Sequence, residues 1–372
     1  MDQKIIMNYE GINQWIKDNE IKKIFLVCDS ALPFLNIKDY FEDLEQRIPV
    51  IRFNKFQPNP LYESVVDGVN LFREEECDSI IAIGGGSALD VAKCIKLYSN
   101  LPGNGVDGAW LKAEIIPNDI PFLAMPTTAG TGSEATRYAV VYYEGAKQSI
   151  TSKTFIPSVV LMDSSALKTL PVYQKKATMC DALCHAIESY WSVNSTEESM
   201  GYSKKAIEMV MANMDGYLAN EDEANANMLL AANTAGKAIN ITQTTAGHAM
   251  CYKVTSLFGC AHGHAAILCD RVLFSWMIEN TDKCIDSRGE DNLKEILDEI
   301  GQALGCTDGR AGAEKLSEIF NKLELEIPSA SESQFEELKK SVNPVRLKNH
   351  PIALKEETIN MLYHKILNGV EK

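Results

Sequence analysis

The chain has 372 residues, and its 36 lysines and arginines against 51 aspartates and glutamates give a formal net charge of −15. Hydrophobic residues make up 45% and charged residues 23% of the sequence, which is typical of globular proteins and excludes a disordered or fibrous chain. Nucleic acids and anionic membranes bind basic surfaces, so neither is expected as a partner. A chain of this length accommodates two domains of ordinary size.

The ten cysteines are scattered and form no CxxC pair, which indicates reduced thiols in a cytoplasmic protein. The N-terminal residues do not follow the pattern of a secretory signal. No apolar run reaches the roughly 20 residues that a membrane helix needs. We therefore expect a soluble intracellular protein.

The first part of the chain alternates short apolar runs with helical patterns. Strands are predicted over 22–30, 50–56, 79–87, 122–128 and 159–163, with a helix over 62–76 and a hairpin formed by 138–143 and 148–152. Strands that are apolar on both faces and separated by helices are typical of a mainly parallel sheet covered on both sides. Asp29 ends the first of these strands, where an acid either contacts a nucleotide ribose or is an exposed turn residue.

Helical periodicity replaces the strand patterns after about residue 165. The predicted helices are 172–193, 200–219, 223–243, 246–258, 263–280, 290–304, 311–323 and 333–341. The expected organisation is therefore an α/β domain over 1–164, followed by an all-helical domain over 165–372.

Two loops follow predicted strands in the first domain. The segment 84–87 (GGGS) ends one strand and opens a helix, so its amides could approach a pyrophosphate at a helix N-terminus. The alternative is a plain glycine-rich turn, and the segment is not the GxGxxG fingerprint. The segment 126–134 (PTTAGTGSE) either wraps a ribose or nicotinamide, or is a polar loop that caps a helix.

The histidines of the second domain form a third constellation. Asp181 and His185 are four residues apart and project from one face of an otherwise apolar helix, where they would be costly without a partner. His248 lies in a second helix, and His262 begins a third. One carboxylate and three imidazoles are a plausible set of ligands for a divalent metal with an open position. A lone histidine would more often be a packing or surface residue.

Together these segments resemble the iron-containing (group III) alcohol dehydrogenase family. The resemblance rests on GGGSALDVAK (84–93), the PTTAGTGSEAT segment, DALCHAIESY (181–190) and GHAMCYKVTSLFGCAHGHA (247–265), which occur in the family's order. It implies a Rossmann-like dinucleotide-binding domain and an all-helical domain with the active site between them, an architecture shared with dehydroquinate synthase. It also implies NAD(H) or NADP(H), one catalytic Fe²⁺ or Zn²⁺, and a homodimer.

The resemblance assigns roles residue by residue. The implied metal ligands are Asp181, His185, His248 and His262. The implied cofactor-binding residues are Asp29, Gly84, Gly85, Gly86, Ser87, Asp90, Thr127, Thr128, Thr131 and Lys147. Asp29 matches a position where an acid favours NAD over NADP.

The sequence departs from the family near the third and fourth ligands. Tyr252 stands where a histidine is usual, and HGHAA replaces HGxxNA, which adds His264. Tyr252 and His264 are therefore the candidate catalytic residues, with Tyr252 as proton donor or as a packing substitution; the ribose and water are another proton source.

The segment 239–255 together with HGHA resembles the phosphonoacetaldehyde reductase subgroup. Its substrate carries a phosphonate dianion, for which Arg137 and Lys253 are candidate ligands, unless they are solvated surface cations. The implied reaction is hydride transfer to a small aldehyde, giving 2-hydroxyethylphosphonate in this subgroup. The alternatives are a general short-chain alcohol, diol or lactaldehyde dehydrogenase and, more remotely, a lyase of the dehydroquinate synthase type.

Overall fold

The computed structural model describes residues 3–342 and 344–369 and divides the chain into two compact units, Met1–Leu170 and Pro171–Lys372. The boundary expected near residue 164 falls at the start of the short 3-10 segment Ser164–Thr169, which belongs to the first unit. Among the described residues, no helix combines the length and apolar character needed to cross a membrane.

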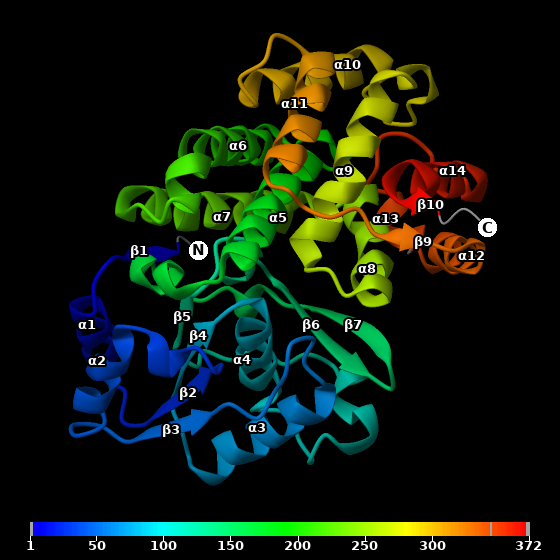
Figure 1. Ribbon diagram of the computed structural model, residues 1–372. Coiled ribbons are helices and arrows are strands. Elements are labelled where there is room, and N and C mark those ends of the chain that lie inside the picture. The colour runs from blue at the N-terminus through cyan, green and yellow to red at the C-terminus, as the bar shows by residue number, and fades with distance from the viewer. Residues whose placement is uncertain (1–2, 343, 370–372) are drawn as a thin grey trace. The chain divides into compact units, whose positions relative to one another are not determined.

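A six-stranded parallel sheet forms the centre of the first unit (Figure 1), with the strands in the order β1–β8–β5–β4–β2–β3. The strands are β1 Lys4–Ile6, β2 Ile24–Cys28, β3 Val50–Phe53, β4 Ser79–Gly84, β5 Phe122–Pro126 and β8 Val159–Leu161. The antiparallel hairpin is β6 Tyr138–Tyr143 with β7 Ala146–Thr151. All five predicted strands and the hairpin are present, and the parallel α/β fold is confirmed. The short strand β1 was not predicted.

Helices cover both faces of this sheet. They are α1 Glu10–Asp18, α2 Ile37–Leu44, α3 Tyr62–Glu74 and α4 Gly86–Tyr98. Successive side chains of a strand point to opposite faces, so Ile24 and Leu26 join the core beneath α1 and α2. Phe25 and Val27 join the core beneath α3 and α4. Two buried faces explain why β2 is apolar at every position.

The sheet has a topological switch point between β2 and β4. After β2 the chain passes through α2 on one face, whereas after β4 it passes through α4 on the other. The loops that follow these neighbouring strands therefore diverge at the carboxyl ends of the strands, the position at which open α/β sheets bind ligands. Asp29 follows β2 at this point, and Gly85 follows β4.

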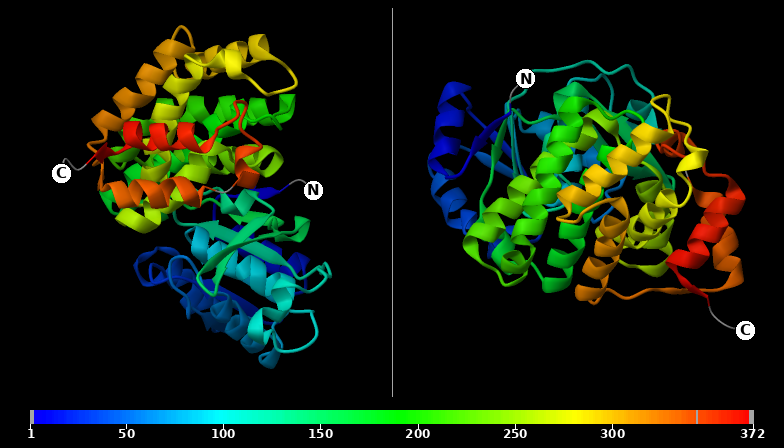
Figure 2. Two further views of the ribbon diagram at one scale, coloured as in Figure 1. Left: turned by 90° about the vertical axis from the view of Figure 1, so that its right-hand side faces the viewer. Right: turned by 90° about the horizontal axis from the view of Figure 1, so that it is seen from above.

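The second unit is helical, as predicted, and Figure 2 shows its helices from two further sides. Its helices are α5 Val172–Trp191, α6 Glu197–Leu218, α7 Asp222–Thr242, α8 Ala246–Phe258, α9 His262–Ile278, α10 Glu290–Ala303, α11 Gly309–Lys322, α12 Glu332–Ser341, α13 Pro344–Leu347 and α14 Glu356–Ile366. Helix α5 packs against α6, α7 and α9, which buries most of its length. A short parallel pairing of β9 Ser329–Ala330 with β10 Asn368–Gly369, which was not predicted, lies among these helices.

A buried histidine in this unit makes folding sensitive to acid. His350 is fully buried against Trp191, and among the described residues neither ring nitrogen has a hydrogen-bond partner. Burial lowers the pKa of His350 from 6.5 to about 4. The unfolded chain therefore binds the proton first as the pH falls from 6.5 towards 4, and stability is lost across that window.

His350 should account for about 2 kcal/mol of the free energy of unfolding that the wild type loses between about pH 7 and about pH 5. We expect the His350→Leu variant to lose that much less over the same pH range, because it has no imidazole to protonate. Urea unfolding at both pH values measures this, and an equal loss in the variant would contradict it.

Candidate functional site

The glycine motif, residues 84–87, lies where β4 ends and α4 begins. Gly85 precedes the helix in an extended conformation, and no side chain of the described residues caps the helix N-terminus. The first-turn amides of a helix lack intrahelical partners, so those of Gly86 and Ser87 can donate to a phosphate. Gly84 has φ +154°, and a Cβ there would lie 2.6 Å from Asp29 Oδ2 and from the Ala88 side chain, which requires glycine.

The segment 126–134, here called the threonine loop, lies directly beside this motif. The Thr127 amide donates to Gly84 O at 3.1 Å, which joins the end of β5 to the end of β4. A Cβ on Gly85 would lie 3.5 Å from the Thr128 methyl, and one on Gly86 would lie 3.0 Å from the Thr131 methyl. The two predicted nucleotide loops therefore meet at one edge of the sheet.

Asp29 completes this edge from β2. Its Oδ2 accepts the Gly85 amide at 3.2 Å, and its Oδ1 accepts the Ala31 amide at 2.9 Å. These two hydrogen bonds fix the carboxylate next to the N-terminus of α4.

Asp90 and Lys93 tie α4 to the threonine loop. Asp90 accepts the Ser133 hydroxyl at 2.8 Å and the Val140 amide at 3.0 Å. Lys93 is completely buried and donates to three backbone carbonyls, of Ser133, Thr136 and Tyr138, at 2.6–3.0 Å. These contacts give both side chains a role in shaping the loop. The other two predicted residues of this unit lie at the hairpin: Lys147 opposite Tyr142, and Arg137 beside the Tyr138 hydroxyl at 3.2 Å.

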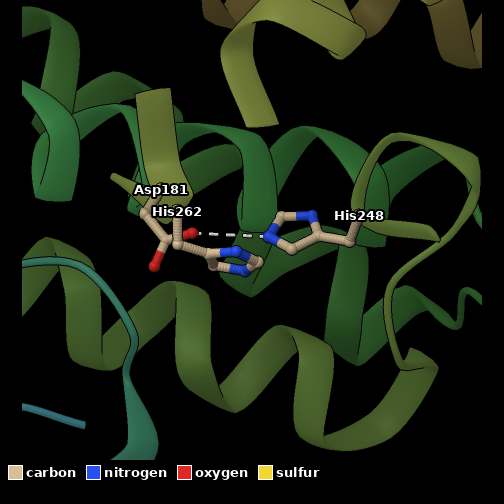
Figure 3. A group of neighbouring side chains, drawn as sticks. All are labelled: Asp181, His248 and His262. Carbon is tan, nitrogen blue, oxygen red and sulfur yellow. Dashed lines mark hydrogen bonds and ion pairs between the residues drawn. The ribbon is translucent and has the colours of Figure 1, made fainter. Parts of the chain in front are cut away.

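Three of the four predicted metal ligands converge in the second unit. Asp181 comes from α5, His248 from α8 and His262 from the first residue of α9, and Figure 3 shows their side chains pointing toward one another. Their potential ligand atoms all lie within 4.8 Å of one another, and His248 Nε2 is 3.4 Å from Asp181 Oδ1. Asp181 and His248 are buried, and His262 is partly buried.

His185, the fourth predicted ligand, lies at the margin of this group. Its Nε2 is 3.9 Å from Asp181 Oδ1, and its ring stacks on that of His248 with centroids 4.4 Å apart. It is adjacent to the three others without joining their 4.8 Å group.

The donor set fits a divalent transition metal. Ligand bonds of about 2.0–2.1 Å in a tetrahedral site place neighbouring ligand atoms about 3.4 Å apart, as between Asp181 and His248. Imidazoles with one carboxylate suit iron or zinc. These four residues would hold the ion.

A carboxylate that was not predicted, Glu188, accepts hydrogen bonds from His248 on the side of the ring away from Asp181. Its Oε1 accepts from His248 Nδ1 and from the His248 amide, the latter at 2.9 Å. Its Oε2 accepts from the amide and hydroxyl of Thr245 at 2.5 and 2.6 Å. A carboxylate on Nδ1 directs the lone pair of Nε2 towards a metal and increases its basicity. Glu188 lies seven residues after Asp181 on α5, so an acid on the same helix face was the available signal.

The electrostatics of this group favour bound positive charge. Burial alone would raise the pKa of Asp181, but His185 and the hydrogen bond with His248 outweigh it and hold the pKa below its usual range. Burial alone would lower the pKa of His248, whereas Glu188 and Asp181 on either side raise it to about 10. A cation in this centre is therefore stabilised by two buried carboxylates.

The two predicted catalytic residues lie in different surroundings. Tyr252 is one turn after His248, and its ring stacks on His262 with centroids 5.0 Å apart. Burial raises the pKa of Tyr252 well above its usual value, so the phenol keeps its proton. His264 lies two residues after His262 and instead lines a pocket of about 550 Å³. Its Nδ1 contacts the Tyr173 hydroxyl at 3.0 Å and its Nε2 contacts Glu326 O at 2.8 Å, which favours a structural role.

The predicted substrate residue of this unit, Lys253, forms an ion pair with Glu337 at 2.5 Å. A cation that was not predicted, Arg346, stacks over the Tyr252 ring with its guanidinium carbon 5.0 Å from the ring centroid. Nothing in the local sequence around Arg346 marks it, because the contact joins distant segments.

Comparisons with known proteins show the family of the chain. Residues 5–164 match the family described as "Iron-containing alcohol dehydrogenase", and residues 175–367 match "Fe-containing alcohol dehydrogenase family, C-terminal". A 1,3-propanediol dehydrogenase of Klebsiella pneumoniae is 32% identical over 82% of this chain and 79% of its own. A phosphonoacetaldehyde reductase of Streptomyces viridochromogenes is 31% identical over 67% of this chain and 66% of its own.

The fold also matches a solved structure. The sulfoacetaldehyde reductase of Bifidobacterium kashiwanohense in complex with NAD⁺ superposes with a TM-score of 0.87, at 24% identity over 98% of this chain and 97% of its own. Relatives with different names match at similar identity. The comparisons therefore do not distinguish the phosphonoacetaldehyde reductase subgroup from other members of the family.

Proposed function

Because this chain belongs to the iron-containing alcohol dehydrogenase family, we propose that it reduces a small aldehyde with NADH at a divalent metal held by the helical unit. The observation that carries the proposal is the convergence of Asp181, His248 and His262 within 4.8 Å. The proposed metal is Fe²⁺ or Zn²⁺. A metal bound there supplies Lewis acidity toward a carbonyl group, and the nicotinamide supplies the hydride.

The chain's own residues have distinct proposed tasks. Asp181, His185, His248 and His262 hold the ion, and Glu188 orients His248. Tyr252 stacks on His262, which shields the ligand ring from water. Its phenol is the proposed proton donor to the carbonyl oxygen as the alcohol forms.

For the cofactor, we propose that Gly84, Gly85, Gly86 and Ser87 bind the pyrophosphate and that Thr127, Thr128 and Thr131 line the ribose and nicotinamide. The adjacency of the two loops supports this assignment. Asp90 shapes the threonine loop through Ser133. Lys147 stays a proposed residue of the cofactor site.

Asp29 is proposed to select NADH over NADPH, because its charge would repel a 2′-phosphate. Asp29→Asn removes that charge, and we expect the ratio of kcat/KM for NADPH to that for NADH to rise about tenfold or more. Steady-state kinetics with both cofactors measure the ratio. Asp78 is a matched control, since it also accepts two backbone amides, of Lys22 and Lys23 at 2.8 and 3.1 Å, and lies beside the start of β4. Asp78→Asn should leave the ratio unchanged, and an unchanged ratio in Asp29→Asn would contradict the assignment.

Two substrate classes are proposed within this reaction. The first is phosphonoacetaldehyde, supported by a relative of that activity at 31% identity. The second is a general short-chain alcohol, diol or lactaldehyde, supported by a 1,3-propanediol dehydrogenase at 32% identity.

The test is an NADH-oxidation screen of the iron-loaded protein with phosphonoacetaldehyde, lactaldehyde, butyraldehyde and succinate semialdehyde. The proposed function requires NADH oxidation with at least one aldehyde that disappears when a chelator removes the metal. A lyase of the dehydroquinate synthase type would regenerate its NAD, so turnover without net oxidation of NADH would contradict the proposal.

A further inference from the structure

An arginine outside the predicted site lies close to the metal ligands. The guanidinium carbon of Arg346 is 5.0 Å from the centroid of the Tyr252 ring. That ring lies 5.0 Å from the ring of His262, at an interplanar angle of 27°. Arg346 therefore contacts a ring that itself stacks on the proposed metal ligand His262, although the two residues are far apart in sequence.

The guanidinium is held in place by the turn between α7 and α8. Arg346 Nη1 donates to Thr244 Oγ1 at 2.5 Å. Asn349, three residues further along, donates to Thr244 O at 3.1 Å and to Gln243 Oε1 at 3.3 Å. Hydrogen bonds from Arg346 and from Asn349 therefore both hold this segment against the turn.

The same turn is connected to the metal ligands. Gln243 has φ 61° and ψ −179°, a strained conformation that is otherwise largely restricted to glycine. It directs the Thr244 hydroxyl to Arg346, while the adjacent Thr245 donates to Glu188. Glu188 in turn holds His248. One strained turn therefore positions both the guanidinium and a metal ligand.

The charge of Arg346 is left available. Among the described residues, no carboxylate forms an ion pair with it, and its hydrogen bond goes to a hydroxyl. A guanidinium offers five N–H donors, so most of them remain for a ligand. Lys253, the neighbour of Tyr252 in sequence, is instead paired with Glu337.

We infer that Arg346 is the specificity-determining residue that binds a tetrahedral oxyanion on the substrate. A guanidinium fork matches the oxygens of a phosphonate or sulfonate better than an ammonium does. With the carbonyl end at the metal site and the oxyanion at Arg346, the substrate class is a short aldehyde with a terminal tetrahedral oxyanion. This inference rests on the proposed function and replaces Lys253 and Arg137 as the anion-binding residues.

The test compares Arg346→Ala with wild type on phosphonoacetaldehyde and on butyraldehyde, a neutral aldehyde. A charged hydrogen bond contributes about 1.5–3 kcal/mol, so KM for phosphonoacetaldehyde should rise about ten- to a hundredfold. KM for butyraldehyde should change less than about twofold. Arg346→Lys should reverse only part of the rise in KM for phosphonoacetaldehyde, because lysine lacks the forked guanidinium group. Lys253→Ala is the matched cation control and should leave both KM values unchanged.

A binding measurement separates this inference from the proposed function. Calorimetric titration with phosphonoacetate, an unreactive analogue, should show affinity reduced about ten- to a hundredfold in Arg346→Ala. An unchanged affinity for phosphonoacetate, or an equal rise in KM for both aldehydes, would overturn the role of Arg346 while leaving aldehyde reduction intact. A wild type that oxidises NADH with neither aldehyde would instead refute the proposed function.

Discussion

Replacing His248 with alanine is expected to remove the bound divalent metal and NADH-linked turnover together. His248 lies between Asp181 at 3.4 Å and Glu188, so its loss removes one ligand and leaves two buried carboxylates without the imidazole that separates them. Removal of a residue that only supports a ligand typically costs 10–100-fold in metal affinity, so loss of the ligand itself should cost at least about 100-fold. We expect kcat/KM to fall at least about 1,000-fold.

Metal analysis after dialysis and steady-state kinetics check this prediction on the same preparation. His364→Ala is the matched control, because His364 is an exposed histidine of α14 that stacks on Phe335. It should retain metal and turnover. If His248→Ala keeps both the metal and full activity, the ligand assignment is wrong.

Gly263→Ala is expected to destabilise the helical unit and to weaken metal binding. A Cβ on Gly263 would lie 2.0 Å from Ala177 O and 2.7 Å from Asp181 N, both on the backbone of α5. Backbone atoms cannot move aside as a flexible side chain can, so α9 would have to shift away from α5. His262 and Asp181 adjoin this contact, and the shift would separate two of the proposed metal ligands. We expect a loss of about 3 kcal/mol in the free energy of unfolding and at least about tenfold weaker metal binding.

Gly201→Ala provides the comparison for this variant. Gly201 lies within α6, and apart from its chain neighbours and the backbone of its own helix, a Cβ there would meet no atom of the described residues within 4 Å. Alanine at such a position should stabilise the protein by about 0.4–1 kcal/mol, since it restricts the unfolded chain. Urea unfolding and metal titration of both variants decide the matter. A Gly263→Ala protein with wild-type stability and metal affinity would show that α5 and α9 do not approach as closely as described.

The fold was largely predictable because most of its sheet strands are continuous apolar runs. Residues such as Phe25 and Leu26 are buried on opposite faces of β2, and this produces the continuous pattern that marks a parallel strand. The strands that were missed lack such a run: β9 and β10 have two residues each, and in β1 only Ile6 is buried, whereas all three residues of β8 are buried. Their pairing depends on distant partners, as in the contact of β1 with β8.

The site was predictable where its residues are periodic along one helix. Asp181 and His185 share a helix face by their spacing of four, and Glu188 continues that face, although its contact with His248 needed the position of α8. The different surroundings of Tyr252 and His264 depend on how α8 and α9 pack. Arg346 reaches Tyr252 only through the tertiary fold, so no local spacing could have revealed it.

Anomalous diffraction from crystals of the iron-loaded protein, recorded at the iron absorption edge, tests the metal centre most directly. We predict one strong peak bonded at about 2.0–2.2 Å to Asp181, His185, His248 and His262, with His185 drawn in from the margin of the group. A peak at another place in the chain, or a protein that binds no iron or zinc with these four side chains intact, would contradict the account.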